Sequence, residues 1–236
     1  MSPPSAAGAA GLPARPGLPR WFDLVAAGAA LLVLAPLLAA VALAVRLSSP
    51  GPVLFRQQRV GRGGQPFTML KFRTMRVGAA GAQVTAAGDP RITSVGHWLR
   101  RWKLDELPEL WNVVRGEMSL VGPRPEVEQY VDLGDPLWRQ VLAVRPGITD
   151  PVTVALRNEE ELLAEARGEP EEYYRRVLQP AKLRGYVEYL QARSWRSDAM
   201  VLFETLAAIL RPNRTFDTVL SGGAGFAGDE GVGGRR

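Results

Sequence analysis

The longest apolar run in the chain lies near its beginning. Residues 24–45 include no charged side chain, and 22 helical residues would extend about 33 Å, enough to cross a bilayer. Pro36 stands near the middle of this run, where it removes a backbone hydrogen bond and kinks or breaks a helix. Arginines flank both ends of the run, which favours the cytoplasmic side for both. The pattern predicts a membrane helix at residues 21–47 and leaves open whether it spans the bilayer with a kink or returns to its starting side.

A hairpin pattern follows this run. Residues 52–59 and 66–73 are rich in strand-forming side chains and are joined by the glycine-rich sequence VGRGGQ, which predicts two antiparallel strands with a tight turn. A phosphate-binding glycine loop is disfavoured because no Gly-Lys-Ser/Thr sequence and no helix follow it. Residues 77–88 are small and indicate a loop of the kind that covers a substrate.

Helical patterns occupy most of the remaining chain. Thr93 or Ser94 is a suitable N-cap for a helix that runs to residue 103. On that helix Trp98 and Trp102 share a face that suits either a membrane interface or the core. A second helix is predicted from residue 104 to Arg115, with Leu107, Leu110, Trp111 and Val114 as its packing face. Three more are predicted at 159–167, 170–192 and 198–210, the last with Asp198 as its cap.

These patterns together predict an α+β fold with one mostly helical domain. That domain covers residues 48–212 and contains the small β-hairpin. The segments on either side of the membrane helix and domain are too poor in bulky apolar residues to order themselves, so we expect a disordered lead at 1–20 and a glycine-rich disordered tail at 213–236.

Charge and composition narrow the classes of function. The 236 residues include 29 Lys and Arg against 24 Asp and Glu, a net charge of +5, and the excess lies early in the chain. A basic surface of this kind suits anionic lipid headgroups or a phosphate-bearing substrate. No helix-turn-helix, zinc-finger or RNA-recognition pattern supports binding to nucleic acid. The absence of cysteine excludes disulfides and thiol catalysis and is compatible with a cytoplasmic location.

The candidate chemistry is concentrated in residues 100–126. Asp105 and Glu106 follow Arg100 and Lys103, and carboxylates beside fixed cations suit phosphoryl transfer, because the charge of a diphosphate must be neutralised before an anionic nucleophile approaches. Mg²⁺ is the metal ion that such a pair would hold together with phosphate oxygens. Neighbouring residues of a helix point about 100 degrees apart, so the two carboxylates should have different tasks.

Two further residues of this segment need an assignment. Arg124 lies between Pro123 and Pro125, whose fixed backbone angles make its guanidinium a preorganised donor for a phosphate; an ion pair with Glu126 or Glu128 is the structural alternative. Glu109 lies one helical turn beyond Asp105, and we expect it to face solvent.

Ordered motifs then identify a family resemblance. The sequences GPVLFRQQRVG, KFRTM, DPRIT, LDELPELWNV, GEMSLVGPRP and RPGIT follow one another between residues 51 and 149. Over about residues 22–211 the chain resembles the bacterial sugar transferases, which are small monotopic phosphoglycosyl transferases. The resemblance implies a re-entrant helix-break-helix at Pro36. The chain departs from the family at Ala35, where a serine is common, and at residues 150–158, which leaves the sugar preference open.

The resemblance also implies a reaction. Such an enzyme transfers a sugar-1-phosphate from a UDP-sugar to a polyprenol phosphate (undecaprenyl phosphate), releasing UMP through a covalent aspartyl-phosphosugar. Asp105 would be the nucleophile, and Glu106 would help to bind Mg²⁺ or handle a proton. The substrate phosphates or the nucleotide would be held by Lys71, Arg100, Arg124 and Arg157, with Pro123 and Pro125 around Arg124.

The implied setting is the inner (cytoplasmic) membrane, with the catalytic domain facing the cytoplasm. There the reaction would begin the assembly of an exopolysaccharide, capsule, O-antigen or glycoprotein glycan. Membrane lipids and downstream glycosyltransferases would be partners, and the sequence is compatible with a homodimer without indicating one. The alternatives are a catalytically silent scaffold for a glycan assembly complex and a membrane-associated hydrolase.

Overall fold

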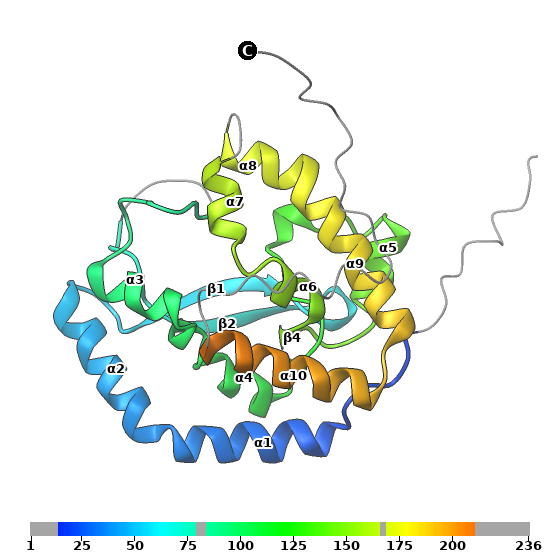
Figure 1. The fold of residues 1–236 in the computed structure, drawn as a ribbon, viewed down its shortest axis with the longest axis horizontal. Coiled ribbons are helices and arrows are strands. Elements are labelled where there is room, and N and C mark those ends of the chain that lie inside the picture. Colours follow the sequence, from blue (N-terminus) through cyan, green and yellow to red (C-terminus); the bar gives the residue numbers. More distant parts are fainter. Residues whose placement is uncertain (1–13, 79–83, 166–168, 211–236) are drawn as a thin grey trace, which may run out of the picture.

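A computed structural model describes residues 14–78, 84–165 and 169–210. It is an α+β fold in which helices predominate, as predicted. In Figure 1 the strands β1 and β2 cross the centre, α1 and α2 run along one edge, and α7, α8 and α9 lie on the opposite side. The helices are α1 Arg20–Val33, α2 Ala35–Ser48, α3 Ser94–Arg101, α4 Glu109–Arg115, α5 Pro136–Val141, α6 Pro151–Ala155, α7 Glu159–Glu165, α8 Pro170–Tyr173, α9 Gln179–Ala192 and α10 Trp195–Leu210; the strands are β1 Leu54–Val60, β2 Pro66–Phe72, β3 Ser119–Val121 and β4 Gly147–Thr149.

The apolar run forms two helices. The chain breaks at Leu34, and α1 and α2 are bent by 63° relative to each other. Pro36 occupies the first turn of α2, where a missing N–H leaves no hydrogen bond unmade. Within the described ranges no single helix is long and apolar enough to cross a membrane, whereas the bent pair together has sufficient length and hydropathy.

Both helices of this pair also pack on the body of the protein. Ala27 of α1 is fully buried in the main core, and Arg20 donates hydrogen bonds to the carbonyls of Val113 and Met118. Val41 and Val45 of α2 form a second core cluster with Phe72 and Leu99. The outer face remains apolar and open, with the exposed side chains Trp21, Leu24, Val25, Leu32, Val33, Leu37, Leu43 and Leu47.

The predicted hairpin is confirmed. Strands β1 and β2 are antiparallel, and their register pairs Phe55 with Lys71 and Val60 with Pro66. Gly63 and Gly64 have φ angles of 68° and 76°, a region that favours glycine, so they make the turn. One face of β2 reaches the core through Met69, and its end presents Lys71 to the site.

A second, two-stranded parallel sheet was not indicated by the sequence. It pairs β3 with β4, and its strands approach so closely that a Cβ on Gly147 would lie 2.1 Å from the backbone nitrogen of Gly122. The residues of GEMSLVGPRP and RPGIT are therefore brought side by side. This pairing holds the segment that carries Arg124 against the segment that begins α6.

The prediction of one helix from residue 104 to Arg115 was wrong. Leu104–Glu106 is a short 3₁₀ turn, which we call the Asp-Glu turn, and α4 begins only at Glu109. Pro108 has no N–H to donate, and hydrogen bonds of the 3₁₀ type join Leu107 to Leu104 and Trp111 to Pro108. The carboxylates consequently lie in a separate turn before α4 and not in the first turn of a long helix. Gly116, with φ of 87°, ends α4 as predicted.

Other outcomes concern the packing of single residues. Trp111, expected in the core, is half exposed, and Trp98 is exposed as well, which excludes a core position for it. Thr93 caps α3 through a hydrogen bond from Gly96 N. The three C-terminal helical predictions correspond to α7, to α8 with α9, and to α10, but α10 begins at Trp195 rather than at Asp198.

The terminal expectations lie largely outside the described residues, including the whole of the tail at 213–236 and residues 1–13 of the lead. Residues 14–19 are not a free chain, because Arg15 N bonds Leu190 O at 3.0 Å and Leu18 packs against the core.

Candidate active site

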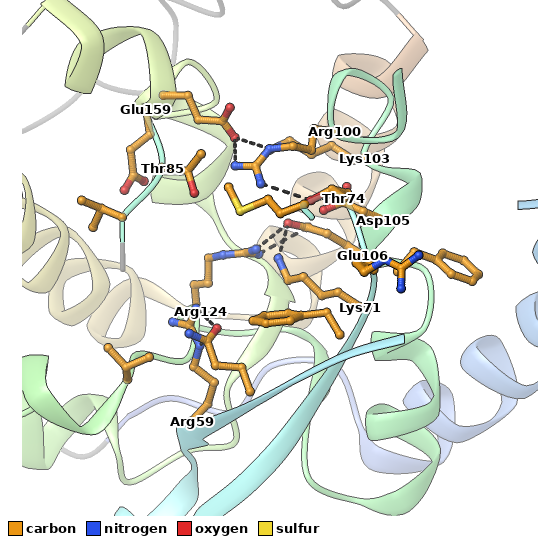
Figure 2. Close-up of a pocket in the computed structure, with 18 of the residues that line it drawn as sticks. Arg59, Lys71, Thr74, Thr85, Arg100, Lys103, Asp105, Glu106, Arg124 and Glu159 are labelled. Atoms are coloured by element: carbon orange, nitrogen blue, oxygen red, sulfur yellow. Dashed lines mark hydrogen bonds and ion pairs between the residues drawn. The ribbon is translucent and has the colours of Figure 1, made fainter. Parts of the chain in front are cut away.

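A cavity of about 1290 Å³ lies between the hairpin, the Asp-Glu turn, α6, α7 and α9. Its walls carry most of the predicted site residues: Lys71, Arg100, Asp105, Glu106, Arg124, Pro125 and Arg157. Pro123 does not line it; its carbonyl accepts from Gly147 N at 3.0 Å and so joins β3 to β4. Pro36 lies in α2, away from the cavity. Figure 2 shows that the acids and cations converge from separate elements.

Asp105 is buried on the Asp-Glu turn, with 6% of its surface exposed. Its Oδ1 atom has no hydrogen-bond partner within the described part of the chain. Burial raises the pKa of Asp105, the positive charge of Lys71 opposes that rise, and the negative charge of Glu106 adds to it. A buried carboxylate oxygen without a partner, beside cations, is suited to attack an electrophile.

Glu106 has the opposite environment. It accepts a hydrogen bond of 2.9 Å from Lys71 Nζ and is held by both terminal nitrogens of Arg124. Figure 2 shows Lys71 and Arg124 pointing toward it from two sides. Burial alone would raise the pKa of Glu106, but Arg124 and Lys71 outweigh it and hold the pKa well below the usual value. The adjacent carboxylates therefore differ as expected: Glu106 is bonded to two cations, whereas Asp105 keeps an oxygen without a hydrogen-bond partner among the described residues.

Glu109 does not face solvent, so that prediction was wrong. It is fully buried, and Lys71 Nζ lies 3.4 Å from its Oε1 atom. Neither of its carboxylate oxygens has a hydrogen-bond partner among the described residues. Burial raises the pKa of Glu109 to about 7, and the charge of Lys71 offsets only part of that effect. Because α4 begins at Glu109 rather than at residue 104, its side chain points inward beneath Lys71.

The remaining predicted cations line other parts of the wall. Arg100 donates to Glu160 of α7, with a shortest distance of 2.6 Å, and lies 3.4 Å from the Thr74 hydroxyl. Arg157 has a buried Nη1 atom without a partner within the described residues, and burial lowers its pKa. Both guanidinium groups could reorient toward an anionic ligand.

Lys103 is a further residue of the site; the sequence shows it as one of the cations before Asp105 but indicates no function for it. It lines the cavity directly before the Asp-Glu turn and has a left-handed backbone, with φ of 55°. A left-handed conformation is uncommon outside glycine, and it directs the turn into the cavity.

A polar cluster at the far end of the cavity was missed by sequence reasoning. Tyr174 donates a 2.5 Å hydrogen bond to Glu126, and Lys182 lies 3.5 Å from Glu126 and 3.2 Å from the Tyr174 oxygen. Arg59 adds a charge 3.6 Å from Glu126. These residues come from distant segments and belong to no common motif, so only the fold brings them together. A π-helical turn at Tyr174–Leu178 is the local irregularity that accompanies them.

Two buried charged residues, Asp198 and Arg73, have structural positions. Asp198 is fully buried and accepts hydrogen bonds from Tyr189, Arg193 and Leu18 N, which is a structural role. Arg73, the arginine of the KFRTM motif, is buried and donates to the carbonyls of Ser49 and Pro52, which follow α2. It joins the helix pair to the hairpin.

The side chains of the site could bind Mg²⁺ only together with the phosphate oxygens of a substrate. The described residues contain no cluster of three or more His, Cys, Asp or Glu side chains that could hold a metal ion. Mg²⁺ commonly uses one or two carboxylates and completes its shell with phosphate oxygens and water. The buried Oδ1 of Asp105, which has no hydrogen-bond partner among the described residues, is the carboxylate oxygen available to the ion, whereas Glu106 would have to release Lys71 or Arg124 first.

Comparisons with known proteins agree with these motifs. The model of the family described as "Bacterial sugar transferase" matches residues 15–212. The UDP-glucose:undecaprenyl-phosphate glucose-1-phosphate transferase of Caulobacter vibrioides is 38% identical over 202 residues, which cover 84% of this chain and 71% of that protein. The exopolysaccharide production protein ExoY of Rhizobium meliloti is 34% identical over 207 residues, 80% of this chain and 84% of the relative.

A third relative differs in the sugar that its name gives. The UDP-N-acetylgalactosamine-undecaprenyl-phosphate N-acetylgalactosaminephosphotransferase of Aeromonas hydrophila is 44% identical over 135 residues, which cover 55% of this chain but only 32% of that longer protein. The family match extends from the lead before α1 to the end of α10, and so includes the helix pair, the hairpin and every wall of the cavity. The chain belongs to the bacterial sugar transferase family.

Proposed function

We propose that this protein is a phosphoglycosyl transferase that moves a sugar-1-phosphate from a UDP-sugar to a polyprenol phosphate such as undecaprenyl phosphate. The observation that supports this best is the buried Oδ1 of Asp105, which has no hydrogen-bond partner among the described residues and feels the positive charges of Lys71, Lys103 and Arg100 in one large cavity. The names of the Caulobacter and Aeromonas relatives carry the same class of reaction. The relatives differ in sugar, so the identity of the sugar stays open.

The reaction proceeds in two displacements. Asp105 attacks the phosphorus that bears the sugar, an Asp–O–P bond forms, and the bond from that phosphorus to the bridging oxygen of the diphosphate breaks, so that this oxygen leaves with UMP. A phosphate oxygen of the acceptor then attacks the same phosphorus, and the Asp105 carboxylate leaves. The product is a polyprenyl diphosphate sugar. Covalent catalysis of this kind gives ping-pong kinetics.

The cations around Glu106 prepare the site for this chemistry. Lys71 and Arg124 are fixed near Asp105 by their bonds to Glu106, so they can neutralise an arriving diphosphate without a large rearrangement. Glu106 stays ionised and acts mainly as the anchor of these cations. Arg100 and Arg157 extend the positive wall toward the nucleotide. Mg²⁺, when bound by Asp105 and the diphosphate, would supply further charge neutralisation.

The proposed location is the inner membrane, with the catalytic domain in the cytoplasm. The bend at Leu34 and the exposed apolar face of the pair support a re-entrant helix that dips into one leaflet and returns. Single cysteines at positions 20 and 47 test this topology. Labelling of both from the cytoplasmic face is expected, and labelling from opposite faces would identify a spanning helix.

The wider role is the first membrane step in assembly of an exopolysaccharide or a related glycan. This role rests on the name of the Rhizobium relative and on the acceptor chemistry. Downstream glycosyltransferases would use the lipid-linked sugar, and self-association to a homodimer is a further expectation that light scattering in detergent can test.

The decisive experiment measures UMP release from a panel of UDP-sugars with polyprenol phosphate. Asp105→Asn should abolish lipid product and the covalent intermediate, whereas Asp132→Asn, a surface control, should retain both. Full turnover by Asp105→Asn would eliminate the nucleophile. Absence of transfer with every donor would favour a silent scaffold, and free sugar phosphate without lipid product would indicate hydrolysis.

A further inference from the structure

One edge of the cavity is apolar and open, unlike the charged walls around Asp105. It is formed by Pro52, Phe55 and Val77, with Arg76 beside them, and we call these four residues the apolar rim. Phe55 is 46% exposed and Val77 is 64% exposed. Large apolar side chains held open at the mouth of a polar cavity indicate a ligand with a hydrophobic part.

The apolar rim is attached to the end of the helix pair. A Cβ on Gly51 would lie 2.8 Å from a methyl carbon of Val77, so Val77 packs directly against the segment that leaves α2. Arg73 donates to the carbonyls of Ser49 and Pro52 at 2.6 and 2.5 Å and fixes that segment to β2. A ligand that lies along α2 therefore meets this edge of the cavity first.

The other end of the apolar rim reaches the reacting groups. Phe55 is the register partner of Lys71, and directly opposed residues of an antiparallel pair project on the same face with Cβ atoms about 5 Å apart. Lys71 in turn lies 2.9 Å from Glu106, the neighbour of Asp105. The exposed ring of Phe55 is therefore a direct cross-strand neighbour of the cation that is bonded to Glu106, the residue after Asp105.

The charge of Arg76 and the exposed leucines that precede the apolar rim favour an anionic prenyl lipid as its ligand. Arg76 is exposed and makes no side-chain hydrogen bond or ion pair within the described ranges, so its charge is available to a phosphate. Leu43 and Leu47, on the last two turns of α2, are also exposed and directly precede the rim in the chain. A nucleotide sugar has no chain that would use such a surface, whereas a polyprenol phosphate has both a chain and a phosphate.

We propose that the apolar rim is the acceptor subsite, where the first prenyl units of the polyprenol phosphate lie across Phe55 and Val77 while the phosphate passes Arg76 toward Lys71. The proposal rests on the function proposed above and concerns only its second displacement. An acceptor phosphate oxygen forms the new P–O bond at the phosphorus carried by Asp105, and the Asp–O–P bond breaks. The donor nucleotide would occupy the opposite, polar part of the cavity.

The ping-pong scheme allows the two substrates to be tested separately. Phe55→Ser and Val77→Ser should raise the KM for a long-chain polyprenol phosphate about tenfold or more, because each removes apolar contact area. Exchange of labelled UMP into the UDP-sugar, measured without acceptor, should stay within about twofold of the wild type, because the substitutions remove no contact with the donor. Leu133→Ser, an exposed leucine outside the cavity, is the matched control and should change neither quantity.

Three further arms decide the interpretation. A water-soluble acceptor with a single prenyl unit should show a smaller difference between wild type and variants, and Phe55→Leu should restore most of the long-chain activity.

The acceptor defect should persist in nonionic detergent; a defect confined to anionic phospholipid vesicles would show that the rim binds bulk lipid instead and would overturn the proposal. Equal loss of UMP exchange and lipid product in a variant whose circular dichroism spectrum and thermal midpoint match the wild type would also overturn it. If the wild type exchanges no UMP with any donor, it is the proposed function that fails.

Discussion

Glu109 gives the sharpest prediction, because a buried carboxylate without hydrogen-bond partners should make the protein's stability depend on pH. In the unfolded chain its pKa is near 4.5, and burial raises the pKa to about 7 in the folded protein. Between these values the folded state binds a proton that the unfolded state has lost, so the free energy of unfolding falls as pH rises. Above about pH 7 both states are ionised and this contribution becomes constant.

The size of the effect follows from the interval between the two pKa values. A change from 4.5 to about 7 corresponds to roughly 3 kcal/mol of lost stability. Glu109→Gln keeps the shape of the side chain and removes the titration. The variant should therefore gain about 3 kcal/mol relative to the wild type between pH 4.5 and pH 8. Groups that do not interact with Glu109 contribute equally to both proteins and cancel in the difference.

Denaturant unfolding of both proteins in the same detergent at pH 5, 6, 7 and 8 measures this difference. Glu128→Gln, at an exposed position, is the control and should show no trend with pH. A stability difference between Glu109→Gln and the wild type that stays constant over the whole range would refute the reasoning, because it would mean that Glu109 remains ionised throughout.

Three other substitutions test contacts of the fold, two of them away from the cavity and one, at Lys103, in its wall. Asp198→Asn should cost about 3–5 kcal/mol because it leaves the buried Arg193 without its ion pair, yet turnover per folded molecule should not change. Gly96→Ala should destabilise by about 1–3 kcal/mol, since its Cβ would meet the Thr74 carbonyl oxygen at 2.1 Å; a thermal midpoint equal to that of the wild type would contradict the close approach. Lys103→Gly should stabilise by about 0.5–1 kcal/mol by relieving a left-handed backbone, whereas Lys103→Ala, which keeps that conformation, should bring no such gain.

Local patterns were sufficient for the elements that depend on neighbours in sequence. The glycines of the hairpin turn, the Thr93 cap and Gly116 each act on a backbone within a few residues, and the structure places all three as expected. The predicted cations Lys71, Arg100, Arg124 and Arg157 likewise line a single cavity. Spacing within a motif preserves contacts that the local backbone determines.

Contacts between segments that are far apart in the sequence could not be predicted from such local patterns. The direction of Glu109 depends on whether α4 begins at residue 104 or 109, and periodicity does not resolve a 3₁₀ turn before Pro108. The cluster around Tyr174 and Glu126 joins residues 48 apart in the chain. The parallel pair β3 and β4 is too short to show a strand pattern, so its discovery required the fold.

The way α1 is built into the protein has a practical consequence for anyone seeking a version that dissolves without detergent. Ala27 fills the main core, and Arg20 holds the carbonyls that close α4 immediately after the catalytic segment. Deleting the first two helices would expose that core and free the far end of α4. Solubility is better sought by substituting polar residues for the outward-facing Leu32, Val33 and Leu47, which contribute little to the interior.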